Sequence, residues 1–349
     1  MKIFQLALVI GSLGVTGNVL HAEPASNVSK ILTTHTPEAD GHSPEAMAKA
    51  AKKFLDALGD DLKKQAALPY DSDEKAKWTN VPPRGPQGGV RLGDCDDEQL
   101  KLACNFLRTV MSRQGYEKAR NIMLADDMLL RDGEPRPGFG AENFWLAIFG
   151  EPSAEKPWAI QLDGHHVAIN LSFHGGKVGM SPSFIGTQPK AIKYAGKDIE
   201  VMKGESAVAY RLINSLSDEQ KRVAIVSKKR GGIATAAGKD GVVPEPTGFS
   251  CKELDQKQRA LVVELLEEYV GDLPKRYAKK RLAQLEKEID QMKLAWSGPT
   301  SLESDISYRL QGPTLIIEYS CQDLGGDPLD HLHSMYRNPT NEYGAAALQ

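Results

Sequence analysis

Two groups of short, apolar-rich segments set the strongest limit on how this 349-residue chain can fold. Their content of β-branched and aromatic residues predicts strands. The first group comprises Trp158–Asp163, Val167–Phe173 and Lys177–Phe184, and the second comprises Ser307–Leu310, Thr314–Tyr319 and His331–Arg337. Gly175 and Gly176 supply the positive φ that a tight hairpin needs within the first group. Because such short connections favour antiparallel pairing, each group predicts an antiparallel sheet.

A recurring pattern marks helix starts. Asp96, Ser217 and Asp255 each precede a glutamine by three residues, which is the capping-box arrangement that satisfies free N–H groups at a helix start. Apolar residues with helical spacing also run from Glu45 to Lys64, interrupted by Gly59. The copies are irregularly spaced and strand-like sequence lies between them, so we expect helices packed around a sheet and not a helical solenoid.

A further amphipathic stretch runs from Arg276 to Trp296, with apolar residues at alternating steps of four and three. The seam lasts under three heptads, so packing against its own domain is favoured over a coiled coil. Helices segregated from antiparallel strands predict an α+β fold, in which sheets built from the two strand groups pack with several amphipathic helices.

The first residues predict export. Met1-Lys2 is followed by an apolar run from Ile3 to Leu20 and by Ala22, a small residue that suits signal peptidase. We therefore expect residues 1–22 to be a signal peptide cleaved after Ala22, which makes the protein secreted or periplasmic; an uncleaved membrane anchor is the alternative. No later run is long enough for a membrane span. Residues 23–44, rich in Ser, Thr, Pro and His, predict a flexible leader before a folded part at 45–349.

The net charge and the cysteines limit which partners and which cysteine chemistry the sequence allows. A formal net charge of −3 gives no basic field for nucleic acid. Export permits disulfides, and the four cysteines allow three pairings, of which Cys95–Cys104 with Cys251–Cys321 is one. Four free thiols are equally compatible with the sequence. The absence of a Cys-x-x-Cys motif disfavours a thiolate zinc site or a thioredoxin-like role.

Two histidine pairs are the clearest chemical motif, and they hold four of the eight histidines. Alternation along the strand after Gly164 places His166 on the face opposite the core, whereas His165 has the parity of the apolar residues. His331 and His333 are two residues apart in a strand, so both project to one side, close enough for one metal ion to accept both imidazoles.

Two or three of these histidines with a carboxylate would suit zinc, iron or copper and leave a coordination position open for water or substrate. Glu318 on the neighbouring predicted strand is a candidate ligand or base. Arg337 is a candidate to hold a substrate carboxylate through two hydrogen bonds. Two alternatives stay open, namely a metal-free site that uses histidine as general acid or base, and histidines with structural roles alone.

Long ordered strings in this chain resemble a family called domain of unknown function (DUF) 3500, whose members are often secreted bacterial proteins. The similarity runs from about Phe54 to Gly344 and covers nearly the whole predicted mature chain. The strings are Leu-Asp-Gly-His-His-Val-Ala-Ile-Asn-Leu-Ser-Phe (162–173), Ser-Pro-Ser-Phe-Ile-Gly (181–186), Asp-His-Leu-His-Ser-Met-Tyr-Arg-Asn-Pro (330–339), Gly115–Arg120, Phe149–Ser153, Tyr269–Pro274, Trp296–Pro299 and Arg309–Pro313.

The resemblance implies one domain over 45–349 and places both histidine pairs inside recurring motifs of the family. It implies no particular activity. The chain departs from the family near Trp78, where members tend to carry another histidine and this chain has Trp-Thr-Asn-Val-Pro. Any role of that histidine is therefore absent here.

Three functions fit these observations. The first is an exported metal-dependent enzyme, a hydrolase or an oxidase, that acts on an unknown small molecule. The second is a periplasmic or extracellular protein that binds a ligand or metal without catalysis. The third is a metal-free hydrolase, which would need a serine or aspartate within reach of His166 or His333. A separation of ring nitrogens within about 4.5 Å would make a shared ion plausible.

Overall fold

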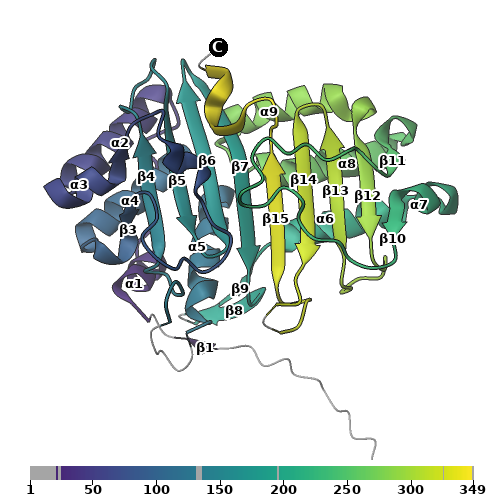
Figure 1. The fold of residues 1–349 in the computed structure, drawn as a ribbon, viewed down its shortest axis with the longest axis horizontal. Helices are drawn as coiled ribbons and strands as arrows, with labels where there is room; N and C mark the ends of the chain where they lie inside the picture. The colour runs from purple at the N-terminus through teal and green to yellow at the C-terminus, as the bar shows by residue number, and fades with distance from the viewer. Residues whose placement is uncertain (1–20, 23–24, 131–135, 195, 325, 348–349) are drawn as a thin grey trace, which may run out of the picture.

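The computed structural model describes residues 21–22, 25–130, 136–194, 196–324 and 326–347. A broad sheet runs through the molecule, with the predicted first strand group in one half and the second group in the other (Figure 1). The predicted signal peptide lies outside the described residues, except for the two-residue strand His21–Ala22.

The strands of the described residues form two sheets. One has three strands in the order β1-β8-β9, and the other has 12 strands in the order β10-β12-β13-β14-β15-β7-β6-β5-β4-β2, with β11 beside β12 and β3 beside β4. The strands are β1 His21–Ala22, β2 Ala67–Leu68, β3 Val90–Arg91, β4 Phe144–Phe149, β5 Trp158–Gly164, β6 Val167–His174, β7 Lys177–Thr187, β8 Ala191–Tyr194, β9 Lys197–Glu200, β10 Ile225–Ser227, β11 Phe249–Ser250, β12 Lys293–Ser297, β13 Ser307–Gly312, β14 Leu315–Cys321 and β15 Leu332–Arg337.

The two predicted strand groups meet where β15 pairs antiparallel with β7. Neighbours from β12 to β4 along the large sheet are all antiparallel. The hairpin between β6 and β7 turns at Gly175 and Gly176, whose φ values of 52° and 74° fit the expected tight turn. The predicted α+β fold is therefore confirmed, with the two groups joined in one sheet.

Helices in the described part of the chain begin where the capping pattern predicted. Asp96, Ser217 and Asp255 each form a capping box, and Gly59 separates α2 from α3. The α-helices are α1 Asn27–Thr34, α2 Pro44–Ala57, α3 Asp60–Ala66, α4 Asp97–Val110, α5 Arg113–Asp127, α6 Lys203–Ser215, α7 Asp218–Ala224, α8 Gln256–Val270 and α9 Lys275–Glu288, and the short 3-10 helices are η1 Asp73–Ala76, η2 Leu92–Asp94, η4 Cys251–Glu253, η5 Ile289–Gln291 and η6 Glu342–Ala347.

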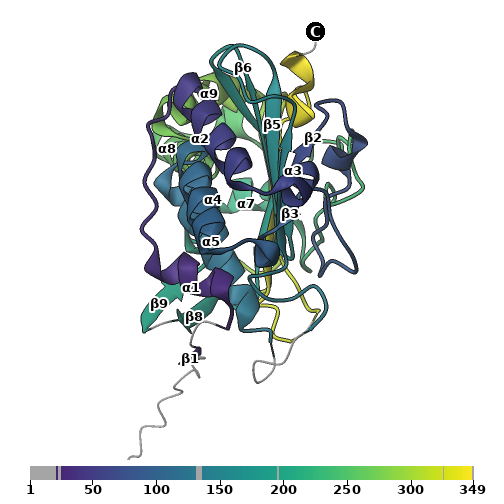
Figure 2. The same ribbon diagram turned by 90° about the vertical axis from the view of Figure 1, so that its left-hand side faces the viewer.

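The two faces of the large sheet are covered differently. Helices α2, α4, α5, α8 and α9 pack on one face, which we call the helix face (Figure 2). Val167, Ile169 and Leu171 point into the main core on that face. The other face, the loop face, carries a small cluster around Ala168 and Phe184 and is crossed by residues 228–248 (Figure 1). The strand parity predicted for β6 is confirmed.

Two local predictions were wrong. The expected flexible leader contains α1, capped by Ser26 and anchored in the core by Val28 and Ile31, because its few apolar residues fall on one helical face. The predicted helical seam 276–296 ends at Glu288, and its last residues form β12. A short apolar run has no clear period, so the partner strands β11 and β13 decide its structure.

All four cysteines are buried and free, so the structure contains none of the three disulfide pairings. Burial raises the pKa of Cys95 and of Cys251 to about 12, and that of Cys104 to about 11. These thiols therefore stay protonated and weakly reactive. In the part of the chain that is described, no helix is both long and apolar enough to cross a bilayer.

Candidate metal centre

A row of three residues across β6, β7 and β15 forms the floor of the candidate site. His166 closes the two-residue turn before β6, Gly186 lies opposite it on β7, and His333 pairs with Gly186 from β15. The Gly186 N–H donates to the His166 carbonyl at 2.7 Å. A Cβ on Gly186 would lie 2.9 Å from the Cδ2 atoms of both rings. The missing side chain therefore lets the two imidazoles approach each other over the strand between them.

The turn gives His166 an unusual backbone conformation, with φ at 68°. A residue other than glycine in the left-handed region costs about 1–3 kcal/mol and is found where the surroundings impose it. Here the ladder bond from Gly186 and a stacked ring, His165 at 3.8 Å between centroids, fix the residue in place. The strained conformation aims one imidazole at β15.

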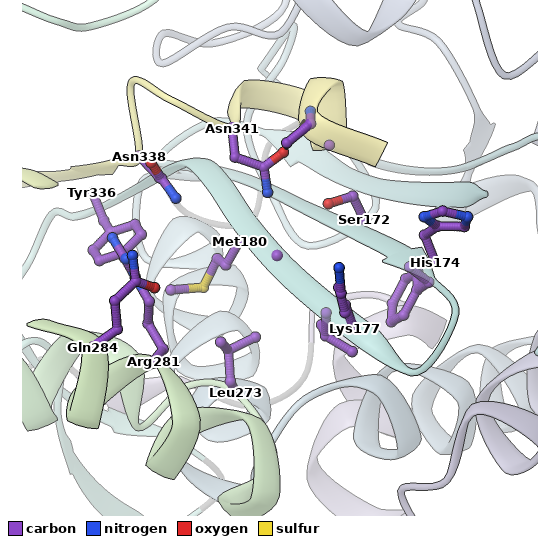
Figure 3. Close-up of a pocket in the computed structure, with 15 residues that line it drawn as sticks. Ser172, His174, Lys177, Met180, Leu273, Arg281, Gln284, Tyr336, Asn338 and Asn341 are labelled. Carbon is purple, nitrogen blue, oxygen red and sulfur yellow. Dashed lines mark hydrogen bonds between the residues drawn. The ribbon is translucent and has the colours of Figure 1, made fainter. Parts of the chain in front are cut away.

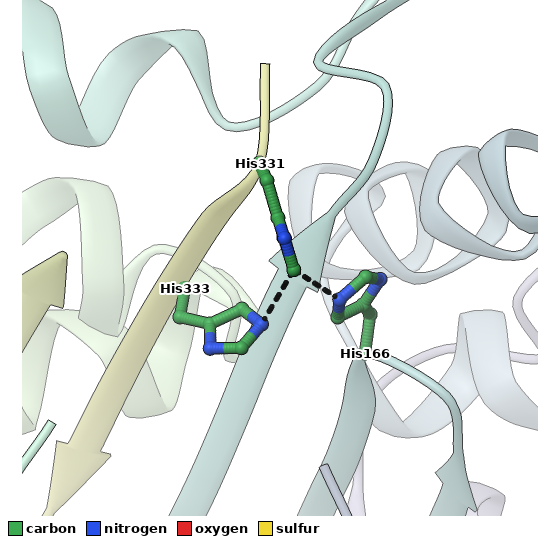
Figure 4. A group of neighbouring side chains, drawn as sticks. All are labelled: His166, His331 and His333. Atoms are coloured by element: carbon green, nitrogen blue, oxygen red, sulfur yellow. Dashed lines mark hydrogen bonds between the residues drawn. The ribbon is translucent and has the colours of Figure 1, made fainter. Parts of the chain in front are cut away.

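Three imidazoles converge at this row (Figure 4). The Nε2 atom of His331 lies 3.0 Å from Nε2 of His166 and 3.0 Å from Nε2 of His333. All three ligand nitrogens fall within 4.8 Å of one another. The 3.0 Å separation of His166 and His331 lies within the limit of about 4.5 Å for a shared ion, and it joins the two histidine pairs across 165 positions of sequence. We call these three residues the histidine trio.

The two contacts of His331 cannot both be hydrogen bonds. Its Nδ1–H donates to the Leu324 carbonyl at 2.7 Å, which leaves a single lone pair on Nε2. One lone pair accepts one N–H in the ring plane, yet two nitrogens face it at the same distance. A cation that took a lone pair from each ring would satisfy all three nitrogens, and the Leu324 carbonyl would then fix the tautomer of a ligand, as is usual for metal-binding histidines.

The electrostatics of the trio favour neutral rings. Burial lowers the pKa of His166 well below its ordinary value, and the neighbouring imidazoles lower it further. Burial also lowers the pKa of His333 to about 3 and lowers the pKa of His331. Neutral imidazole is the form that ligates metal, so the rings need not lose a proton before an ion binds.

The spacing suits a metal of ordinary bond length. Two nitrogens at about 2.1 Å from one ion are roughly 3.0 Å apart at a right angle and roughly 3.4 Å apart at the tetrahedral angle. The two observed 3.0 Å contacts of His331 correspond to the right angle. The buried histidines could therefore hold a metal ion.

His165 lies beside the trio and has a different partner. Its Nδ1 is 2.5 Å from Oδ1 of Asp126, near the end of α5, and its ring stacks on His166 and contacts the edge of Phe139. The other oxygen of Asp126 accepts the Gly140 N–H. Asp126, His165 and His166 form a second close group of ligand atoms, but one His–carboxylate hydrogen bond accounts for the Asp126–His165 contact. We call this pair the His–Asp pair.

A cavity of about 650 Å³ opens over both features. Its wall includes the four histidines of the two pairs together with Phe139 of the segment after α5 and Ile233 of the segment 228–248. A cavity of this size accommodates a small organic molecule. The trio is thus buried in the protein on one side and reachable by a ligand on the other.

Comparison with known proteins adds a family to this geometry. Residues 40–345 match the model of a family described as protein of unknown function (DUF3500). The chain belongs to this family. No curated protein matches the chain, and no solved structure matches it. The histidine trio of this DUF3500 member therefore has to be interpreted from its own chemistry.

Two predicted site residues have other partners. Glu318 on β14 accepts hydrogen bonds from the N–H and hydroxyl of Thr235 and from the Ala234 N–H. The buried Arg337 donates to the Thr235 carbonyl, Asp240 and Glu342. In the structure both side chains anchor the segment 228–248, which forms one wall of the cavity, and neither belongs to the described groups of metal-ligand atoms.

The sequence interpretation missed three contributions to the site. Gly186 makes room for the rings, Asp126 orients His165, and the carbonyl of Leu324 fixes His331. Gly186 stands at the end of one of the strings shared with the family, which was an available signal. Asp126 lies 39 residues before its histidine, and a backbone carbonyl leaves no trace in the sequence.

A second cavity, of about 240 Å³, lies at the other end of β6 and β7 (Figure 3). His174, Lys177, Asn338 and Asn341 line it together with Arg281 of α9. Arg281 donates to the Tyr336 hydroxyl and to Thr314. None of the described groups of metal-ligand atoms includes a residue of this cavity.

Proposed function

We propose that this protein is a metal-dependent hydrolase whose metal is held by His166, His331 and His333. The observation that carries the proposal is the convergence of the Nε2 atoms of three neutral imidazoles. The Nε2 atoms of His166 and His333 both face the single lone pair on Nε2 of His331. Three protein ligands with a cavity on the open side are the arrangement of catalytic zinc sites, in which the remaining position takes water or substrate.

The residues around the trio support hydrolysis. A divalent ion in such a site supplies Lewis acidity and lowers the pKa of coordinated water. The His–Asp pair stands beside the trio with its imidazole oriented by Asp126, as a group that takes up a proton must be. The cavity above gives a substrate access to both features.

The other functions fit the geometry less well. A protein that only binds metal is expected to enclose the ion, whereas this trio borders a cavity of about 650 Å³. A metal-free hydrolase needs a serine or aspartate at His166 or His333, and both rings instead have His331 as their polar contact. Zinc, iron or copper would each accept three imidazoles, so the ligands alone do not separate a hydrolase from an oxidase. Consumption of oxygen separates them, because an oxidase requires it.

We also propose that the protein is exported to the periplasm or medium. The support is the sequence of residues 1–22, with its apolar run and Ala22 before the expected cut. Fractionation of cells that express the full chain, followed by amino-terminal sequencing, tests this directly. A mature protein beginning at Glu23 supports export, and an intact chain in the cytoplasm contradicts it.

Metal analysis of the purified protein tests the proposed function. We expect about one zinc, iron or copper ion per chain after reconstitution, because the structure offers one trio of this kind among the described residues. We expect hydrolysis of some members of a panel of esters, amides and phosphoesters, loss of that activity with a chelator and recovery with metal. Absence of bound metal before and after reconstitution would refute the proposal. Oxygen consumption without hydrolysis would replace the hydrolase with an oxidase.

A further inference from the structure

We infer that the cavity over the histidine trio selects organic anions with an apolar body, such as medium-chain or aromatic carboxylates. The inference rests on the proposed function, because the ion held by the trio supplies part of the charge. It concerns the ligand class, which metal binding alone does not define. It is supported by the charge of the cavity, the placement of Arg136 and the apolar side chains of the walls.

The cavity has an excess of positive charge. The described residues that line it include Arg136 and no aspartate or glutamate. Three neutral imidazoles leave the charge of a divalent ion uncompensated. Asp126, which is not among the lining residues, bonds His165, and Asp323 forms an ion pair with Arg230 at 3.2 Å. An anionic ligand would restore charge balance, and a cationic one would be repelled.

Arg136 is placed to receive an anionic group. Its guanidinium lies 4.1 Å from the centroid of the Phe139 ring, and that ring contacts His165 edge-on at 5.0 Å. One Nη donates to the Leu129 carbonyl at 2.6 Å. A guanidinium has five N–H donors in a planar fork that matches a carboxylate, so this bond orients the group and leaves donors for a ligand. The Phe139 ring thus lies between the guanidinium of Arg136 and His165 of the His–Asp pair.

Much of the rest of the wall is apolar, although the polar residues Asn80, Gln188 and Gln322 also line it. Met128, Leu129, Phe139 and Ile233 are half-buried around the cavity. Val81, 54% exposed, and Leu324, 72% exposed, are among the large hydrophobic residues most open to solvent, and both line the same cavity. Exposed apolar side chains gathered at a cavity mark a surface that a ligand covers.

Calorimetry on metal-loaded full-length protein tests the inference. The probes are acetate, butyrate, hexanoate and phenylacetate, with hexanamide and phenylacetamide as neutral counterparts of similar shape. Metal content is measured first. We expect hexanoate to bind at least about tenfold more tightly than hexanamide, and affinity to rise about three- to fourfold per methylene as the apolar walls are covered. Cobalt-loaded protein gives a second readout, because anions near the ion change its visible spectrum.

Arg136→Gln is the decisive variant. It should weaken hexanoate binding about 10- to 100-fold, the range for a hydrogen bond to a charged group, without changing metal content or hexanamide binding. Lys177→Gln, which removes a positive charge at the second cavity, is the matched control and should bind hexanoate as the unmodified protein does.

The outcomes separate the two proposals. Protein that loads metal but binds hexanoate and hexanamide equally, or an Arg136→Gln variant with unchanged affinity, overturns the ligand class and leaves the metal site intact. Acetate binding as tightly as hexanoate overturns the apolar part of the inference. Failure to load metal refutes the proposed function, and the ligand class falls with it.

Discussion

The two ends of the strands β6, β7 and β15 carry similar residue types and differ in what those residues do. One end holds the histidine trio, and the other holds His174, Lys177 and Asn338 at the second cavity. In the trio, the buried ring nitrogens point at one another, and the Leu324 carbonyl fixes the tautomer of His331. At the other end Lys177 is exposed and Asn338 accepts from Thr340. A cavity with polar walls thus becomes a candidate site when its polar atoms converge on one point.

Glycine also has a different use at each end. Gly175 and Gly176 adopt positive φ in the hairpin, with open space at Gly175 where a side chain would be. Gly186 lies within the ladder of β7, and a Cβ there would strike both ligand rings and the Leu332 carbonyl. The hairpin needs the conformational freedom of glycine, whereas the histidine trio needs its small volume.

Removal of a trio ligand should give the largest difference between the two ends. We expect His333→Ala to lower metal affinity by more than about 100-fold, because even changes outside the ligands cost 10- to 100-fold. His174→Ala, at the second cavity, should leave affinity unchanged. Equilibrium dialysis with metal analysis measures both variants. Equal metal binding by the two variants would show that the trio is not the metal site.

A substitution of Arg337 tests how much the end of β15 away from the trio contributes to the free energy of unfolding. Its guanidinium is fully buried against Asp240 and Glu342. Arg337→Met should lower the free energy of unfolding by about 3 kcal/mol, at the low end for a broken buried pair because Asp240 is 30% exposed. Lys177→Met is the surface control, expected within about 0.5 kcal/mol. Urea unfolding measures both variants. An Arg337→Met protein with the same free energy of unfolding as the unmodified protein would contradict the anchoring role.

A methyl group on Gly186 should damage the metal centre without removing a ligand. Because the new Cβ would push the rings of His166 and His333 apart, we expect metal affinity to fall about 10- to 100-fold, comparable to loss of an outer-shell partner. Gly232→Ala is the matched control, since Gly232 lines the same cavity and a Cβ added there would have nothing within 4 Å. Competition with a coloured chelator gives the affinities. Similar values for both variants would argue against a shared ion.

His165 should give the smallest effect on metal binding. Its ring stacks on His166 but is not part of the trio, so His165→Ala removes a contact worth about 0.5–1.5 kcal/mol and lowers metal affinity less than about tenfold. Any hydrolytic activity should fall about 100-fold or more, as for loss of a general base. Metal content and turnover are measured on the same sample. A loss of metal as complete as in His333→Ala would make His165 a ligand.

Local pattern predicted much of the fold. Capping boxes at Asp96, Ser217 and Asp255 located three helix starts, because a cap depends on side chains within one turn. Alternation correctly assigned Val167 and Ala168 to opposite faces. The predictions failed where few residues carried the signal, as in the segment around α1 and in β12, since packing partners decide the structure of short apolar runs.

The sequence by itself determined that His331 and His333 could act together, since residues two apart in a strand share a side. Alternation distinguishes His166 from His165, but only the tertiary structure decided that His166 faces β15. That choice depends on β7 lying between β6 and β15 and on Gly186 being at the crossing point. Strand order is set by packing of the whole sheet, with contacts across 165 residues, so no local pattern could specify the histidine trio.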